Sequence, residues 1–108
     1  MHIVKVVEYT MFPGPRYKKL GKNSGEEFRN DVLIPALEKH DEVKVDLDGV
    51  IGYGSSFLEE AFGGLIRAGV EKSKVLSMVT NAKSEDNPNV KSEITSYVKD
   101  AIKKVENC

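Results

Sequence analysis

Residues 43–65 read VKVDLDGVIGYGSSFLEEAFGGL, and this stretch decides the predicted fold. Its first five residues alternate between apolar and polar side chains, which is typical of a strand with one buried face. Gly52-Tyr53-Gly54 then loosens the chain before Ser55-Ser56, where a helix is expected to begin. Ser56 and Glu59 have the spacing of a capping box, in which a hydroxyl accepts from the amide three residues later. The stretch therefore predicts a strand, a loop and a helix in succession.

The predicted helix carries an apolar stripe and two adjacent glycines. Gly63-Gly64 would cost about 1 kcal/mol each relative to alanine, so the helix is expected to approach a neighbouring element closely there. Tight internal packing is the favoured reason, and contact with a partner is the alternative. Gly69 is placed to end the helix in a left-handed conformation. The apolar stripe consists of Leu58, Ala61, Phe62, Leu65 and Ile66.

Further strands and helices are predicted on both sides of this stretch. Residues 3–9 and 75–80 are rich in β-branched and other apolar side chains, which suits strands. A second capping box, Ser24 with Glu27, predicts the start of a helix. Residues 88–105 form a long amphipathic pattern that begins directly after a good helix cap, the asparagine at position 87.

The predicted elements follow the order strand, helix, strand, helix, strand, helix. Such alternation favours an α/β domain with a mixed, mostly parallel sheet of about four strands and helices packed on it. The first strand has a second option, which is antiparallel pairing or a hairpin with residues near Met11. Pro35 lies inside the first predicted helix, where a proline costs about 3 kcal/mol, so a kink or a break is expected there.

Length, charge and cysteine content limit the class of function. The chain has 108 residues, which predicts one domain spanning residues 1–108. Sixteen Lys and Arg stand against seventeen Asp and Glu, a net charge of -1 that disfavours a nucleic-acid partner. No apolar run approaches the ~20 residues that span a bilayer, so no membrane partner is expected. The single cysteine, Cys108, predicts a reducing, cytoplasmic setting, and His2 and His40 lack neighbours at metal-ligand spacing.

Asp46 and Asp48 carry the strongest enzymatic signal. The run Asp46-Leu47-Asp48-Gly49-Val50 resembles the D-x-D motif of haloacid-dehalogenase-type phosphatases, in which the first Asp is the nucleophile and the second the acid/base. That chemistry also needs a lysine and a later acidic pair to hold Mg²⁺, and Glu85-Asp86 lies in a polar loop instead. A strand end followed by a turn is therefore the favoured interpretation, and a Mg-dependent phosphatase stays as a remote alternative.

A basic loop precedes the first predicted helix. Arg16, Lys18, Lys19 and Lys22 run toward a helix N-terminus, where free amides can add to an anion site. Tyr17 stands among these cations and could stack on a base. Solvated loop charge is the favoured explanation of the four residues, and a small anion- or nucleotide-sensing domain is the alternative function that they support.

Residues 43–65 resemble the signature segment of STAS domains, which is a buried strand, a short loop and a Ser-Ser pair that opens an apolar helix. Preceded by residues 14–29, they are similar to the STAS-like family of unknown function found in bacteria and archaea. The resemblance spans about residues 12–69 and implies a STAS-like single layer. In bacterial anti-sigma factor antagonists, the second serine of the loop is phosphorylated by a partner kinase that is also the anti-sigma factor.

The resemblance implies that Ser56 is the phosphorylation candidate, with Ser55 as its neighbour. Gly54 stands where the antagonists usually have Asp, and Phe57 where they usually have Gly. A helix cap is the simpler role of Ser56, and the two roles are compatible because a capping hydroxyl can still be modified. Glu59 and its neighbour at position 60 are expected to repel a phosphate on this serine.

The predicted function is therefore a non-enzymatic regulatory module that binds another protein and needs no cofactor. The resemblance implies a histidine-kinase-type ATPase or an anti-sigma-like protein as the partner. The sequence leaves the identity of the partner and the oligomeric state open. The predicted partner-binding residues are Gly52, Tyr53, Gly54, Ser55, Ser56 and Glu59.

Overall fold

Two short strands form the sheet of the domain. The computed structural model describes residues 1–107, so Cys108 lies outside the described residues. Strand β1 (His2–Lys5) pairs in parallel with β2 (Val43–Asp46), and Val4 stands opposite Val45. Both valines are buried because alternate side chains of a strand point to the same face. The predicted α/β class is confirmed, and the pairing of the first strand is parallel rather than antiparallel.

A single residue occupies the position of a third strand. Lys83 pairs in parallel with Asp46; its N–H donates to the carbonyl oxygen of Val45 (2.9 Å), and its carbonyl oxygen accepts from the N–H of Leu47 (2.8 Å). The prediction of about four strands is therefore wrong, since two strands and this bridge are what the described residues contain.

The strand predicted over residues 75–80 is a helix. Helix α6 (Lys72–Thr80) buries three side chains of this run, Val75, Met78 and Val79. Their spacing of three and four residues matches one face of a helix. Because the run is only six residues long, its apolar positions fit the period of a strand and the period of a helix alike.

The first predicted strand stops at Lys5 and turns into a helical turn. Helix α1 (Val6–Tyr9) closes with a hydrogen bond from the N–H of Thr10 to the carbonyl oxygen of Val6 (2.9 Å). The following residue, Met11, does not form a hairpin with β1. Its carbonyl oxygen accepts from the N–H of Ile51 (3.0 Å), which joins the segment after β1 to the loop after β2.

Three consecutive segments form one helix over residues 25–39. They are α2 (Gly25–Phe28), the π-helical turn η2 (Arg29–Leu33) and α3 (Ile34–Lys39). The predicted capping box is confirmed, since the Glu27 N–H donates to Ser24 Oγ (3.1 Å) and the Ser24 N–H to Glu27 Oε1 (3.3 Å). Of the kink or break expected at Pro35, the break is absent: the helix widens into the π-helical turn just before the proline and then continues.

The helix predicted after the second strand also contains a π-helical turn. Its parts are α4 (Ser55–Leu58), η3 (Glu59–Gly63) and α5 (Gly64–Arg67). Gly69 adopts the predicted left-handed conformation with a φ of 89°. The Val70 N–H then bonds to the carbonyl oxygen of Leu65 (3.0 Å) and ends the helix.

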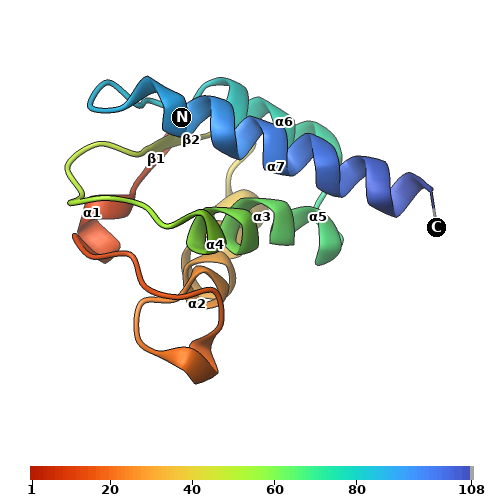
Figure 1. Cartoon of the computed structure of the whole chain (residues 1–108). Helices are drawn as coiled ribbons and strands as arrows, with labels where there is room; N and C mark the ends of the chain where they lie inside the picture. Colours follow the sequence, from red (N-terminus) through yellow and green to blue (C-terminus); the bar gives the residue numbers. More distant parts are fainter. Residues whose placement is uncertain (108) are drawn as a thin grey trace.

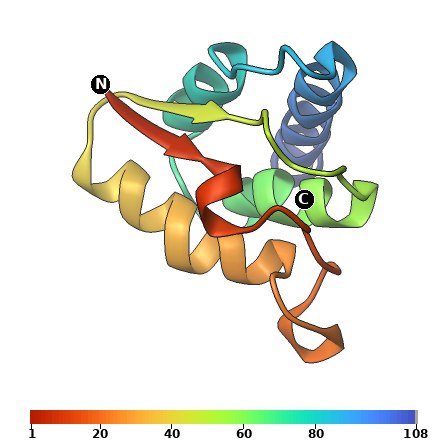
Figure 2. The same ribbon diagram turned by 90° about the vertical axis from the view of Figure 1, so that its left-hand side faces the viewer.

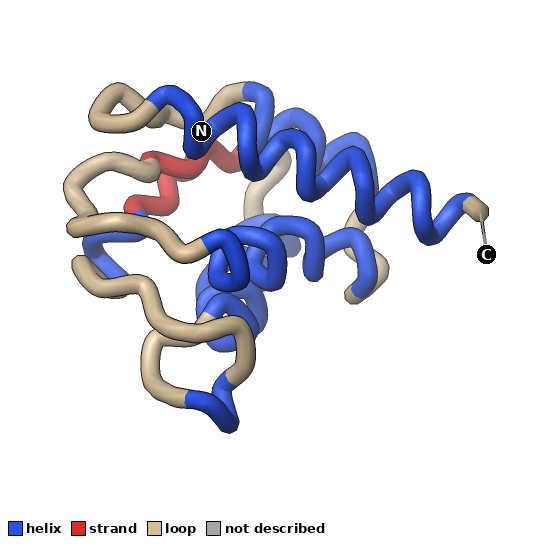
Figure 3. Tube along the Cα trace, in the orientation of Figure 1, coloured by secondary structure: helices blue, strands red, loops and turns tan. Residues whose placement is uncertain are grey.

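The helix of residues 55–67 lies at the centre of the domain (Figure 1). On one side it contacts α2, and on the other it contacts α7 (Pro88–Glu106), which begins at the predicted cap Asn87. The rings of Phe28 and Phe57 lie 5.8 Å apart between centroids, and those of Phe28 and Phe62 6.5 Å. Figure 3 shows that helices make up most of the chain and that the two strands lie side by side. None of the helices described is both long and apolar enough to cross a membrane.

Candidate functional site

The predicted partner-binding residues form an exposed loop and helix start after β2. The side chains of Ser55 and Ser56 are exposed, as are Gly52 and Gly54. A β-carbon added to either glycine would meet no atom within 4 Å. Neither glycine has a positive φ, since the positive-φ glycines of the described chain are at positions 49 and 69. Open space, rather than backbone strain, is therefore what these two glycines provide.

Tyr53 anchors this loop from within. Its hydroxyl donates to the carbonyl oxygen of Leu47 (2.7 Å), and its ring lies 6.2 Å from that of Phe57. Burial raises the pKa of Tyr53, and the nearby carboxylates of Asp46 and Asp48 raise it further. The tyrosine therefore stays neutral and fixes the loop, while the residues on both sides of it face solvent.

The helix begins two residues earlier than the predicted capping box requires. Gly54 occupies the cap position without a side-chain hydrogen bond, and its carbonyl oxygen accepts from the Leu58 N–H (3.2 Å). The expectation that Ser56 caps the helix is therefore wrong, because Ser56 is the second helical residue. Its exposed hydroxyl is left available, and the carboxylate of Glu59 is used elsewhere.

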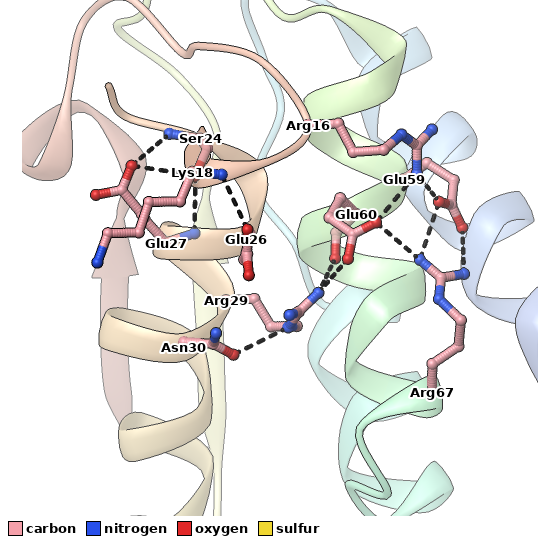
Figure 4. A network of polar contacts seen from close by, with 10 residues as sticks. All are labelled: Arg16, Lys18, Ser24, Glu26, Glu27, Arg29, Asn30, Glu59, Glu60 and Arg67. Carbon is pink, nitrogen blue, oxygen red and sulfur yellow. Dashed lines mark hydrogen bonds and ion pairs between the residues drawn. The ribbon is translucent and has the colours of Figure 1, made fainter. Parts of the chain in front are cut away.

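Glu59 and Glu60 bind three arginines from three parts of the chain (Figure 4). Arg67, on the same helix, contacts Glu59 Oε2 at 2.7 Å and Glu60 Oε1 at 3.4 Å. Arg16, from the basic loop, contacts Glu59 Oε1 at 2.5 Å and Glu60 Oε1 at 3.2 Å. Arg29, from the neighbouring helix, pairs with the other carboxylate oxygen of Glu60 and donates to its carbonyl oxygen (3.2 Å). We call these five residues the arginine–glutamate cluster.

The glycine pair makes room for this cluster. Gly63 lies one turn after Glu59 and one turn before Arg67, so no side chain separates the two charged groups. A β-carbon on Gly63 would stand 2.5 Å from Glu59 Oε2, and one on Gly64 would stand 2.5 Å from Arg29 Nη1. The close approach that the sequence predicts at Gly63-Gly64 is thus confirmed, and it is internal.

The arginine–glutamate cluster carries one excess positive charge, because three arginines surround two glutamates. The hydrogen bonds from Arg67 and Arg16 lower the pKa of Glu59 against the opposing effect of burial. Glu59 and Glu60 follow Ser56 by three and four residues, on the same side of the helix. The three guanidinium groups balance the negative charge of the two glutamates.

Residues that sequence reasoning missed complete the cluster. The predicted motifs do not connect Arg29, Glu60 and Arg67, although Glu59, Gly63 and Arg67 recur at a four-residue interval. A glycine between opposite charges at that interval is a usable local signal. Arg16 and Arg29 contact glutamates that are more than thirty positions away in the sequence. No local sequence pattern predicts such contacts.

The four basic residues predicted as an anion site do not share one environment. Arg16 points toward the helix of residues 55–67, as Figure 4 shows. The three lysines belong to or flank η1 (Lys18–Leu20) and are exposed. The backbone N–H of Lys18 donates to Glu26 Oε1 (2.9 Å), and Nζ of Lys19 lies 5.9 Å from the centre of the Tyr17 ring. Lys22 lies beyond them on the same loop.

Asp46 and Asp48 fasten two loops together. Asp46 Oδ1 accepts from the Asp48 N–H (3.0 Å), and Asp48 Oδ1 accepts from the Asp86 N–H (2.9 Å). Asp86 Oδ2 in turn accepts from the N–H of Gly49 (2.9 Å), whose φ is 90°. These contacts account for both carboxylates as parts of a turn. Across residues 1–107, no group of three or more His, Cys, Asp or Glu side chains is placed to hold a metal ion.

Comparison with protein families gives a match. A family described as a STAS-like domain of unknown function matches residues 24–87, which is more than half of the chain. The matched region runs from the Ser24 cap through the exposed loop to the cap of α7. It contains four residues of the arginine–glutamate cluster, whereas Arg16 precedes it. Comparison with curated proteins and with solved structures gives no match.

Proposed function

Because the chain belongs to the family of STAS-like domains of unknown function, we propose that it is a regulatory module that binds another protein through residues 52–56. The observation that carries this proposal is the contrast at the start of α4. Four residues of this segment are exposed, whereas Phe57 and Leu58, which follow directly, are fully buried. Glycines and serines at residues 52–56 form an exposed surface at the start of a well-packed helix. Their small side chains allow a partner to approach the backbone closely.

We further propose that phosphorylation of Ser56 regulates this binding, and three features support it. The hydroxyl of Ser56 is exposed and caps nothing. The serine lies in the first turn of a helix, where the helix dipole favours negative charge. The arginine–glutamate cluster, with its excess positive charge, lies one turn further along. A phosphate would add about -1.5 to -2 charge to an otherwise neutral contact surface.

The proposed partner is a kinase-like ATPase or an anti-sigma-like protein, and its support is the family resemblance of the loop. An exposed serine beside small residues presents the hydroxyl that such a kinase must reach. Two other functions have less support. Arg16 is engaged by Glu59 and Glu60, which removes one of the four cations from an anion site. The hydrogen bonds of Asp46 and Asp48 explain both residues without catalysis, and the family description names no reaction.

The proposal is tested by isolating the tagged chain from the organism that encodes it. Gly54→Trp should abolish recovery of the partner and leave the circular dichroism spectrum unchanged, because open space surrounds Gly54. Ser77→Trp, at an exposed position of α6, is the matched control and should retain the partner. Recovery of the same partner with Gly54→Trp, or of no partner with the wild-type chain, would overturn the proposal.

A further inference from the structure

Large apolar side chains are exposed mainly on two neighbouring segments. Of the eight that are exposed within residues 1–107, five belong to residues 11–20 or to the loop after β2. Phe12 is 67% exposed, Ile51 70% and Leu20 64%. Exposed apolar groups that gather in this way mark interaction surfaces, whereas scattered ones are ordinary. The five are Met11, Phe12, Tyr17, Leu20 and Ile51.

Backbone hydrogen bonds connect the segments that carry these side chains. The N–H of Ile51 donates to the carbonyl oxygen of Met11 (3.0 Å), so the two exposed segments lie side by side. Two residues after Phe12, the N–H of Gly14 donates to the carbonyl oxygen of Asn23 (2.8 Å) and closes the base of the loop that carries Tyr17 and Leu20. Figure 2 shows α1, this projecting loop and the loop after β2 together on the side that faces the viewer.

The two ends of this surface carry opposite charges. The projecting loop exposes Lys18, Lys19 and Lys22, which we call the basic end. At the other end, Glu8 lies on α1 three residues before Met11, and Glu85 and Asp86 lie on the loop before α7. The hydrogen bond from the Gly49 N–H to Asp86 Oδ2 (2.9 Å) brings these residues beside the loop that carries Ile51. We call Glu8, Glu85 and Asp86 the acidic end, although the exposed Lys5 and Lys83 on the same segments reduce its charge.

We propose that this surface binds a second copy of the chain in a two-fold symmetric dimer. A two-fold axis places the basic end of each copy against the acidic end of the other, so one surface supplies both halves of the contact. The exposed side chains outside the projecting loop, Met11, Phe12 and Ile51, then meet each other. The net charge of -1 leaves little overall repulsion between copies. The contact depends in part on ion pairs between exposed side chains, so the dimer should be weak and sensitive to salt.

The test is sedimentation equilibrium of the full chain over a range of concentrations, at low and at high salt. The wild-type chain should approach the mass of a dimer as its concentration rises, and added salt should raise the dissociation constant. A monomer at every concentration, or growth beyond a dimer, would overturn the proposal. Neither result contradicts the partner site proposed at residues 52–56, because that site does not need a second copy of the chain.

Charge reversal identifies the contact. The basic-end variant Lys18→Glu/Lys19→Glu/Lys22→Glu and the acidic-end variant Glu8→Lys/Glu85→Lys should each weaken self-association by about tenfold or more, since attraction becomes repulsion at both contacts. An equimolar mixture of the two should restore the dimer, because each altered end then meets its opposite. All five residues are exposed, so both variants should keep the wild-type circular dichroism spectrum. Unchanged association of the variants, or no recovery in the mixture, would refute this contact.

Discussion

Gly64 lies directly beneath the guanidinium group of Arg29: a β-carbon on this glycine would stand 2.5 Å from Arg29 Nη1. The missing side chain is what allows an arginine of one helix to reach Glu60, which is 7% exposed, on the next. Gly64 has a low helix propensity, but it leaves the space that Arg29 needs to pair with Glu60.

Gly64→Ala should lower the free energy of unfolding by about 1–2 kcal/mol, although alanine favours the helix by about 1 kcal/mol. The methyl group displaces Arg29 and leaves the buried carboxylate of Glu60 with weaker partners. In an Arg29→Met background the same substitution should stabilise the protein, because only the helix preference remains. Urea denaturation of the four proteins measures this change of sign. A stabilising effect in both backgrounds would contradict the role given to Gly64.

Glu59 makes the stability depend on acid pH. Its hydrogen bonds from Arg67 and Arg16 lower its pKa in the folded state. The unfolded chain therefore binds the proton first as the pH falls, and the stabilisation by Glu59 is present above the unfolded pKa, near 4.3. It is lost as the pH falls through the folded pKa. Glu59→Gln should be less stable at neutral pH and should lose less stability between about pH 5 and pH 3.

The measurement is urea denaturation of Glu59→Gln and of the wild-type chain at several pH values. Glu106→Gln is the control, because Glu106 contacts only the exposed Lys72 among the residues described. Its pH profile should follow that of the wild-type chain. Parallel profiles for Glu59→Gln and wild type would show that the cluster does not stabilise the ionised carboxylate.

Phe62→Ala should lower the free energy of unfolding by about 3–5 kcal/mol, which approaches the whole stability of a small domain. The Phe62 side chain is fully buried and meets the ring of Phe28 at 6.5 Å between centroids. Thermal denaturation followed by circular dichroism measures the loss. An effect no larger than that of the exposed substitution Ser77→Ala would mean that this helix does not face the core.

Features that depend on neighbouring residues could be predicted from the sequence. The Ser24 cap, the left-handed Gly69 and the cap at Asn87 each rest on contacts within a few residues. Residues 75–80 could not be assigned, because six residues satisfy both the two-residue and the 3.6-residue period. Residues 75–80 form a helix because that conformation buries Val75 and Met78 in the core.

The same limit applies to the candidate site. The exposed loop and the helix start at residues 55 and 56 follow from local glycines and serines, and the sequence predicted them. The cap assigned to Ser56 was wrong by two positions, because Gly54 supports the helix start without a side chain. The arginine–glutamate cluster could not be assembled in advance, since Arg16 and Arg29 come from other segments and meet Glu60 only after folding.

Ser56 should carry a phosphate in a fraction of the chains isolated from the organism that encodes them. The hydroxyl is exposed and lies one turn before the arginine–glutamate cluster, whose excess positive charge should favour the added anion. Intact-mass analysis over several growth conditions should detect a species heavier by one phosphate group. Ser56→Ala should remove that species and Ser55→Ala should retain it. Modification that survives Ser56→Ala would move the site to another residue.

The central claim, that residues 52–56 contact another protein, is tested most directly by crosslinking inside the cell. A photoreactive amino acid at position 52 has room, since no atom lies within 4 Å of a β-carbon there, and the exposed position 77 on α6 is the control. Illumination should give one discrete product between position 52 and a different protein, absent at position 77 and lost in a Gly54→Trp chain. No discrete product at position 52, or the same product from position 77, would contradict the account.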